Sequence, residues 1–285
     1  MHGILTFLSG KRRQDAALDW SDVAFIILSS QSDSSLLRVE LALTTWITEL
    51  NTLRAATDIV MPAFRCKPGA ILDRCHQAEL KALISQHHPS GSLTQLHLIV
   101  TDPVPYNSTV SFTFLALRWV TLNISPKRYF FHIDDDTYVH PSRFLSFMRA
   151  LDHRVDYRQP LNFGSVSDAG NSLCYWWYDG CFAQGGSGYG LSAGAIPALL
   201  AGEARCMAAF QARDRSFLRR YPGEAADRSR WGAATDLVIG QCIQLLFSTP
   251  VIHCASFESS NPAQLSTEHL EGSVTLHRLK LPLGG

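Results

Sequence analysis

The chain has 285 residues, of which 46% are hydrophobic and 10% aromatic, and its 25 basic residues balance its 25 acidic ones. This composition excludes a disordered protein, and the absence of net charge gives no general field that would attract nucleic acid or an anionic membrane. The longest early apolar run, residues 4–8, is far below the ~20 residues that span a bilayer, and basic residues follow it where a signal peptide would have them first. We therefore expect a folded protein with no transmembrane segment or signal in this chain.

The first part of the chain alternates apolar runs with segments of helical periodicity. Continuous apolar runs, typical of strands buried on both faces, predict strands over 22–30, 58–63, 96–101 and 128–133. Apolar residues at three-to-four spacing predict helices over 36–50, 77–85 and 112–122, and a further helix that begins near Pro141. The alternation predicts an α/β fold with a Rossmann-like, mostly parallel sheet and flanking helices. We expect an N-terminal extension, residues 1–21, and a single domain over residues 22–285.

Three consecutive aspartates, Asp134, Asp135 and Asp136, directly follow the strand predicted over 128–133. If the chain stays extended, Asp134 and Asp136 point to the same face at the carboxyl end of a parallel sheet, where such folds bind ligands. Carboxylate oxygens suit magnesium or manganese, and a diphosphate can complete the coordination. The alternative is an acidic turn before the next helix.

A glycine-rich segment, residues 182–192, contains Gly185 and Gly186 and precedes a short helix predicted over 193–201, with Ser192 as a possible N-cap. Glycines at these positions permit the backbone to approach a ligand closely, whereas the alternative is a flexible turn without a ligand. Asp236 then begins an apolar helix over 237–247 and is either a cap or a catalytic base. His277 ends a short β-like stretch near the C-terminus, and a lone histidine is usually structural.

Seven cysteines and two glycosylation sequons, at Asn107 and Asn123, bear on the compartment. The cysteine spacing would fit three disulfides and one free thiol in a secretory protein, and the sequons favour the same compartment. The alternative is a cytosolic enzyme whose thiols are unpaired and mostly buried.

Together, the segments DVAFIIL, Arg38 with Thr45-Trp46, YFFHIDDDTYV, FAQGGSGYGLS, TDLVIGQCI and TLH resemble the Fringe-like β1,3-glycosyltransferases, including the core 1 β1,3-galactosyltransferases. The similarity runs from about Asp22 to His277. It implies a GT-A fold, a UDP-sugar donor carrying galactose, N-acetylglucosamine or glucose, a manganese ion, an inverting reaction and the Golgi lumen. The acceptor would be a hydroxyl of a glycan or glycoprotein.

The resemblance also implies a role for each candidate residue. Asp136 and His277 resemble the metal ligands, and Asp134 and Asp135 resemble carboxylates near the ribose and sugar of the donor. Asp236 resembles the catalytic base, although Thr235 stands where the family has a preceding acid.

Arg38, and the glycine-rich segment with Gly185 and Gly186, are further candidates for the donor site. For Arg38 we expect contact with the diphosphate, with an ion pair at the surface as the alternative.

Two other classes of function remain open at this point. One is a catalytically inactive Fringe-like module that binds glycans or acts as a chaperone, which would lack the metal acid or the base. The other is a metal-dependent hydrolase, which would need further carboxylates or histidines near the metal.

Overall fold

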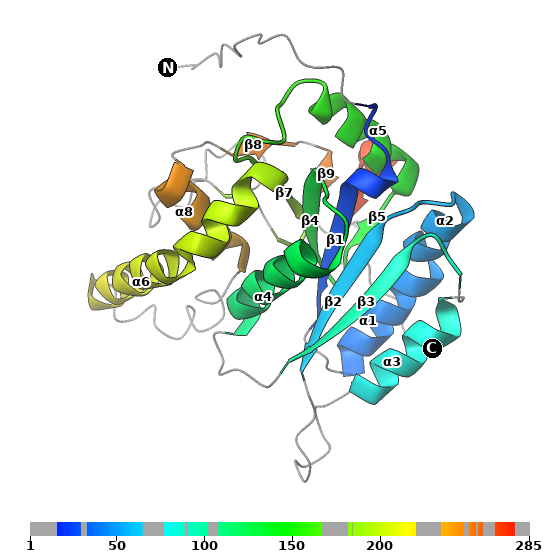
Figure 1. Cartoon of the computed structure of the whole chain (residues 1–285), viewed down its shortest axis with the longest axis horizontal. Helices are drawn as coiled ribbons and strands as arrows, with labels where there is room; N and C mark the ends of the chain where they lie inside the picture. Colours follow the sequence, from blue (N-terminus) through cyan, green and yellow to red (C-terminus); the bar gives the residue numbers. More distant parts are fainter. Residues whose placement is uncertain are drawn as a thin grey trace.

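The structure, a computed structural model, describes residues 16–29, 33–64, 77–88, 91–101, 108–166, 182–183, 185–220, 235–247, 251–254, 256–258 and 266–276. The strands of a seven-stranded sheet lie in the order β3-β2-β1-β4-β7-β6-β8 (Figure 1). They are β1 (Val23–Leu28), β2 (Asp58–Phe64), β3 (Gln95–Thr101), β4 (Tyr129–Asp134), β6 (Asn162–Gly164), β7 (Tyr189–Ser192) and β8 (Ile252–His253). A small second sheet contains β5 (Tyr138–Val139), β10 (Thr275–Leu276) and β9 (Phe257–Glu258), in that order.

The first four strands of the large sheet are parallel, whereas β7 runs antiparallel to both of its neighbours, β4 and β6. The register aligns His132 of β4 with Tyr189 of β7. The end of β4 and the beginning of β7 therefore lie at the same edge of the sheet. This mostly parallel α/β sheet confirms the predicted fold class.

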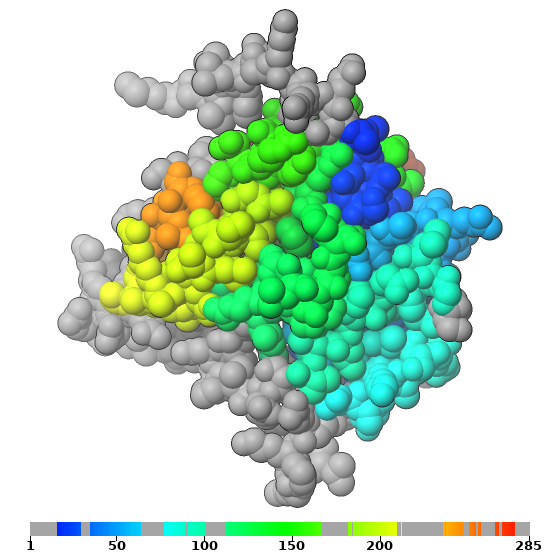
Figure 2. Space-filling model, in the orientation of Figure 1, coloured from blue at the N-terminus to red at the C-terminus, as the bar shows by residue number. Residues whose placement is uncertain are grey.

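Helices cover both faces of the sheet. They are α1 (Asp33–Thr44), α2 (Trp46–Thr52), α3 (Gln77–His87), α4 (Ser108–Asn123), α5 (Pro141–Asp152), α6 (Ile196–Arg220), α8 (Thr235–Phe247) and α9 (Thr267–Gly272). In the space-filling view, α4 and α6 lie across the front of the molecule and hide much of the sheet (Figure 2). None of the helices in the described ranges is long and apolar enough to cross a membrane.

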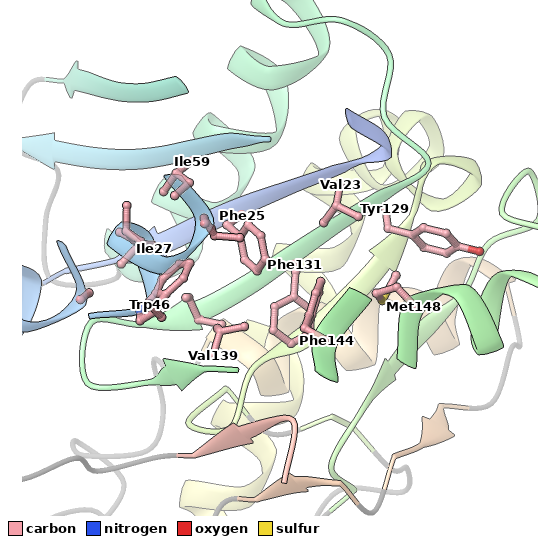
Figure 3. Close-up of a cluster of buried hydrophobic side chains, with 14 of the residues drawn as sticks. Val23, Phe25, Ile27, Trp46, Ile59, Tyr129, Phe131, Val139, Phe144 and Met148 are labelled. Atoms are coloured by element: carbon pink, nitrogen blue, oxygen red, sulfur yellow. The ribbon is translucent and has the colours of Figure 1, made fainter. Parts of the chain in front are cut away.

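The two faces of the sheet bury two separate hydrophobic clusters. One cluster lies between the sheet and α1, α2, α3 and α5, and it includes the neighbouring rings of Phe25, Phe131 and Phe144 (Figure 3). The ring of Phe144 lies 5.1 Å from that of Phe25 and 4.9 Å from that of Phe131, in tilted and edge-on arrangements that aromatic pairs favour. The other cluster lies between the sheet and α4, α6 and α8. Burial on both sides explains why the strands are continuous apolar runs.

Two helices differ from the sequence prediction. The helix predicted over 36–50 is divided at Thr45, whose hydroxyl donates to the carbonyl of Leu41 at 2.6 Å, a bond that bends helices. The short helix predicted over 193–201 is wrong, because α6 runs for 25 residues after a 3-10 turn. Ser192 makes no capping bond there. It ends β7, where its buried hydroxyl donates to the carbonyl of Gln159 at 2.6 Å.

The expectation of three disulfides is also wrong. Cys206, Cys242 and Cys254 are free and buried among apolar side chains of the two clusters, so the remaining four cysteines leave room for two disulfides at most. Those four, residues 66, 75, 174 and 181, lie outside the described residues.

Candidate active site

The acidic triplet forms a turn at the end of β4. The strand ends at Asp134, and the amide of Thr137 donates to the Asp134 carbonyl at 3.1 Å. The chain therefore does not stay extended through Asp136, contrary to the geometry assumed from the sequence. The amide of Asp135 donates to the carbonyl of Leu28 at 3.1 Å, which fixes this turn to the end of β1. The three carboxylates thus lie at the carboxyl edge of the parallel strands, as predicted.

Arg38 of α1 makes an ion pair with two of these carboxylates. Its Nε lies 3.1 Å from Asp135 Oδ1, and its Nη1 lies 3.6 Å from Asp136 Oδ2. This is the ion pair that the sequence left as the alternative to a diphosphate contact. One guanidinium thus lies within ion-pair distance of both carboxylates, so Arg38 holds Asp135 and Asp136 near each other and orders the acidic turn in this structure.

Asp135 is the most deeply buried member of the triplet, with 7% of its surface exposed. Burial raises the pKa of its carboxyl, and the negative charge of Asp136 raises it further, while hydrogen bonds from Ser35 and Ser29 and the charge of Arg38 oppose the rise. The neutral form of the Asp135 carboxyl is therefore favoured by its burial, and the positive charge of Arg38 counteracts this effect.

A tight turn of four residues, Gly185–Gly188, faces the acidic turn. We call it the glycine turn, and it is closed by a hydrogen bond from the amide of Gly188 to the carbonyl of Gly185 at 2.8 Å. The hydroxyl of Thr137, directly after the triplet, donates to the carbonyl of Gly186 at 2.7 Å. This bond joins segments that are 49 residues apart in the sequence.

Asp236 meets the same glycine turn from the first turn of α8. Its Oδ2 accepts a hydrogen bond from the amide of Gly185 at 2.7 Å. The absence of a side chain at Gly185 permits this approach, since a Cβ there would lie 3.3 Å from the Asp236 carboxyl carbon. The structure thus brings Asp134, Asp135, Asp136, Arg38, Gly185, Gly186 and Asp236 together, whereas His277 lies outside the described residues.

Two threonine hydroxyls at the site, those of Thr137 and Thr275, were missed by sequence reasoning. Besides Thr137, the hydroxyl of Thr275 in β10 donates to the carbonyl of Ser187 at 2.6 Å, across 88 residues of sequence. Thr137 follows the triplet and Thr275 lies two residues before His277, so proximity to candidate residues was the only signal in the sequence.

A neutral layer lies beneath the carboxylates. The fully buried ring of His132 stacks on that of Tyr189 with centroids 4.9 Å apart and planes 3° from parallel. Burial lowers the pKa of His132 to about 3, so its ring is neutral near pH 7. Burial, together with the charges of Asp236 and Asp134, raises the pKa of Tyr189 well above its ordinary value. Because the two rings are buried and uncharged near pH 7, they provide a region of low dielectric that strengthens the electrostatic interactions of the nearby carboxylates.

The glycine turn depends on the backbone conformation of Gly188, which has a φ of +87°. A Cβ on Gly188 would lie 2.7 Å from the ring of Phe131. We expect Gly188→Ala to lower the free energy of unfolding by ~2–4 kcal/mol, the sum of the cost of a positive φ and of overpacking. Urea denaturation measures the loss.

Gly91→Ala is the matched control, because Gly91 has a φ of +90° and a Cβ there would meet no atom within 4 Å. It should lose only ~1 kcal/mol. Equal losses for the two variants would contradict the tight packing of the glycine turn against Phe131.

An acidic turn and a glycine turn at the carboxyl edge of a mostly parallel sheet, with helices on both faces, place the protein in the GT-A fold class. The sequence then identifies its family. The profile of the Fringe-like family matches residues 37–281, so the chain belongs to the Fringe-like family and is a glycosyltransferase.

A comparison with solved structures finds similarity to a glycosyltransferase involved in the glycosylation of the major capsid of PBCV-1. That structure has a TM-score of 0.46 and 8% identity, over 91% of this chain and 93% of the other. The comparison with curated proteins gave no match.

Proposed function

We propose that the protein is an inverting, manganese-dependent transferase. It moves galactose, N-acetylglucosamine or glucose from a UDP-sugar to a hydroxyl of a glycan or glycoprotein and forms a β1,3 linkage. The observation that carries this proposal is the glycine turn, which contacts the residue after the acidic triplet and Asp236 at once. Asp136 and Asp236, which are 100 residues apart in the sequence, are thereby held at one edge of the sheet.

The residues at the acidic turn fit a divalent cation. Carboxylate oxygens are the donors that magnesium and manganese prefer, and the charge of three neighbouring aspartates favours a cation there. The described residues contain no group of three histidine, cysteine or acidic side chains arranged as a complete metal site. In the proposal, Asp136 and His277 would hold manganese, which would supply Lewis acidity at the diphosphate of the donor. Asp134 and Asp135 would lie near the ribose and the sugar of the donor, and Gly185 and Gly186 would be further donor contacts.

Asp236 is the proposed catalytic base. Its carboxylate takes the proton of the acceptor hydroxyl while that oxygen forms a bond to the anomeric carbon of the donor sugar. The bond from the anomeric carbon to UDP breaks, its electron pair leaves with the diphosphate, and the configuration at that carbon inverts. The hydrogen bond from the Gly185 amide to Oδ2 orients the carboxylate for this step.

Arg38 has two compatible tasks in this proposal. Its ion pairs order Asp135 and Asp136, and its positive charge lies next to the position proposed for the diphosphate. A positive charge at that position would stabilise the leaving group as negative charge develops on it.

Transfer is tested by incubating the protein with a panel of UDP-sugars, with and without manganese, and by measuring UDP release and transfer to glycan acceptors. Release or transfer with one UDP-sugar that requires manganese supports the proposal. Manganese-dependent UDP binding with no turnover for any donor or acceptor would instead favour an inactive module that binds glycans.

We also place the protein in the Golgi lumen, on the strength of its family. The sequon residue Asn123 is exposed at the end of α4, as a glycan acceptor in that compartment must be, whereas Asn107 lies outside the described residues. Light microscopy of the tagged protein with a Golgi marker tests the location, and a cytosolic signal would contradict it.

A further inference from the structure

Three consecutive residues of the glycine turn each make one hydrogen bond to a different segment of the chain. The Gly185 amide donates to Asp236 of α8, the Gly186 carbonyl accepts from Thr137 after β4, and the Ser187 carbonyl accepts from Thr275 of β10. All three donor-acceptor distances lie between 2.6 and 2.7 Å. The backbone of one turn therefore sets the relative positions of three segments that are remote in the sequence.

Each of these segments carries a residue of the proposed reaction. Thr137 directly follows Asp136, Thr275 precedes His277 by two residues, and Asp236 makes the third bond itself. Thr275 also pairs with Val139 of β5, so the strand that leads to His277 is fixed both to the glycine turn and to the segment after the acidic triplet.

The two threonine hydroxyls lie out of reach of solvent. Thr137 is 3% exposed, and Thr275 and Ser187 are fully buried. If either hydroxyl is removed, water cannot replace the lost donor, and a backbone carbonyl is left without its hydrogen bond. The segment is then free to shift, and a shift of about 1 Å at a catalytic group is costly.

We propose that Thr137 and Thr275 are positioning residues that align the metal ligands with the base through the glycine turn. The inference rests on the proposed function and adds two residues to it. Neither threonine touches the reacting atoms. Their hydroxyls act through the glycine turn. They set the positions of Asp136, His277 and Asp236 relative to one another when the donor binds.

The test compares Thr137→Val and Thr275→Val, which keep the side-chain shape and remove the hydroxyl, with Thr57→Val. Thr57 is the matched control because the residue is only 1% exposed and its hydroxyl also donates to a backbone carbonyl, that of Val23, at 2.8 Å. It lies at the amino edge of β1 and β2, opposite the site. All three variants should show a similar fall in the denaturation midpoint.

The site variants should differ from the control in manganese affinity and turnover. We expect Thr137→Val and Thr275→Val to weaken manganese binding in the presence of UDP by ~10-fold or more, the scale seen when residues that orient metal ligands are removed. Their kcat should fall as well. Thr57→Val should retain the manganese affinity and kcat of the native protein. Calorimetry measures the manganese affinity independently of activity. Thr137→Ser and Thr275→Ser keep the hydroxyl, so these variants should have the manganese affinity and kcat of the native protein.

The outcomes separate the inference from the proposed function. If the native protein neither binds UDP with manganese nor transfers sugar, the proposed function is wrong and the inference falls with it. If the native protein is active but both site variants behave like Thr57→Val, the inference alone is overturned. Should the valine variants fail to fold, Thr137→Cys and Thr275→Cys replace them, since a thiol is a weaker donor of similar size. Native manganese affinity in these cysteine variants would also overturn it.

Discussion

Asp136→Ala is expected to abolish sugar transfer and to weaken UDP binding in the presence of manganese. The variant removes the carboxylate that we assign to the metal, and it leaves Arg38 paired with Asp135 at 3.1 Å, so the acidic turn should keep its fold. Loss of metal-dependent stabilisation of the leaving diphosphate amounts to several kcal/mol, and each ~1.4 kcal/mol is a factor of ten. We expect the transfer rate to fall by ~10³-fold or more.

Two measurements separate this explanation from a general loss of structure. UDP affinity by calorimetry should fall with manganese present and stay the same without it, and the denaturation midpoint should change little. Asp156→Ala, at an exposed carboxylate near Arg158, is the control and should match the native protein. Full transfer activity in Asp136→Ala would show that the metal assignment is wrong.

Asp236→Asn should lower turnover by ~10²-fold or more while the affinity for the UDP-sugar persists, because the change removes the general base and keeps the shape of the side chain. The amide oxygen of asparagine can accept the same hydrogen bond from the Gly185 amide, so the glycine turn should stay in place. Thr235 should not substitute for the base, because a hydroxyl has no useful basicity near neutral pH. Calorimetry and transfer rates, measured side by side, test both parts.

The control for this variant is Asp152→Asn. Asp152 is also a partly buried carboxylate, and it lies away from the site. It accepts hydrogen bonds from the Tyr129 hydroxyl at 2.8 Å and from Arg128 at 3.0 Å. It should lose stability and keep turnover. If turnover in Asp236→Asn is unchanged, or if donor affinity collapses with it, Asp236 is instead a cap of α8 or a donor ligand.

Much of the fold could be predicted from the sequence because the pattern of burial is local. The strand predicted over 128–133 appears as β4, since a strand with helices on both faces is apolar at almost every position. Neither the division of the helix at Thr45 nor the strand that ends at Ser192 was predicted. The first involves a hydrogen bond from a hydroxyl to a carbonyl, and the second is defined by antiparallel pairing with β4 and β6. Residue type alone does not show which carbonyl such a hydroxyl will meet.

The site was predicted in its parts and not in its assembly. The acidic triplet, Gly185 and Asp236 were recognisable as residue types in suitable places, and their roles stay predictions. What joins them is a set of contacts across 49, 51 and 88 residues, made by the backbone of the glycine turn. No periodicity or motif encodes such contacts, because they exist only after the sheet has formed. The placement of Thr275 beside Ser187 could not have been read from the chain.

The reversed direction of β7 has a consequence for how this protein family can diversify. Because β7 runs antiparallel to β4, pairing of His132 with Tyr189 fixes the acidic and glycine turns next to each other. The distance between the turns is therefore independent of how many residues connect them. Changes in the length of that connection can therefore leave both turns in place, as long as Phe182 and Ala183 keep their positions in the buried cluster between the sheet and α4, α6 and α8.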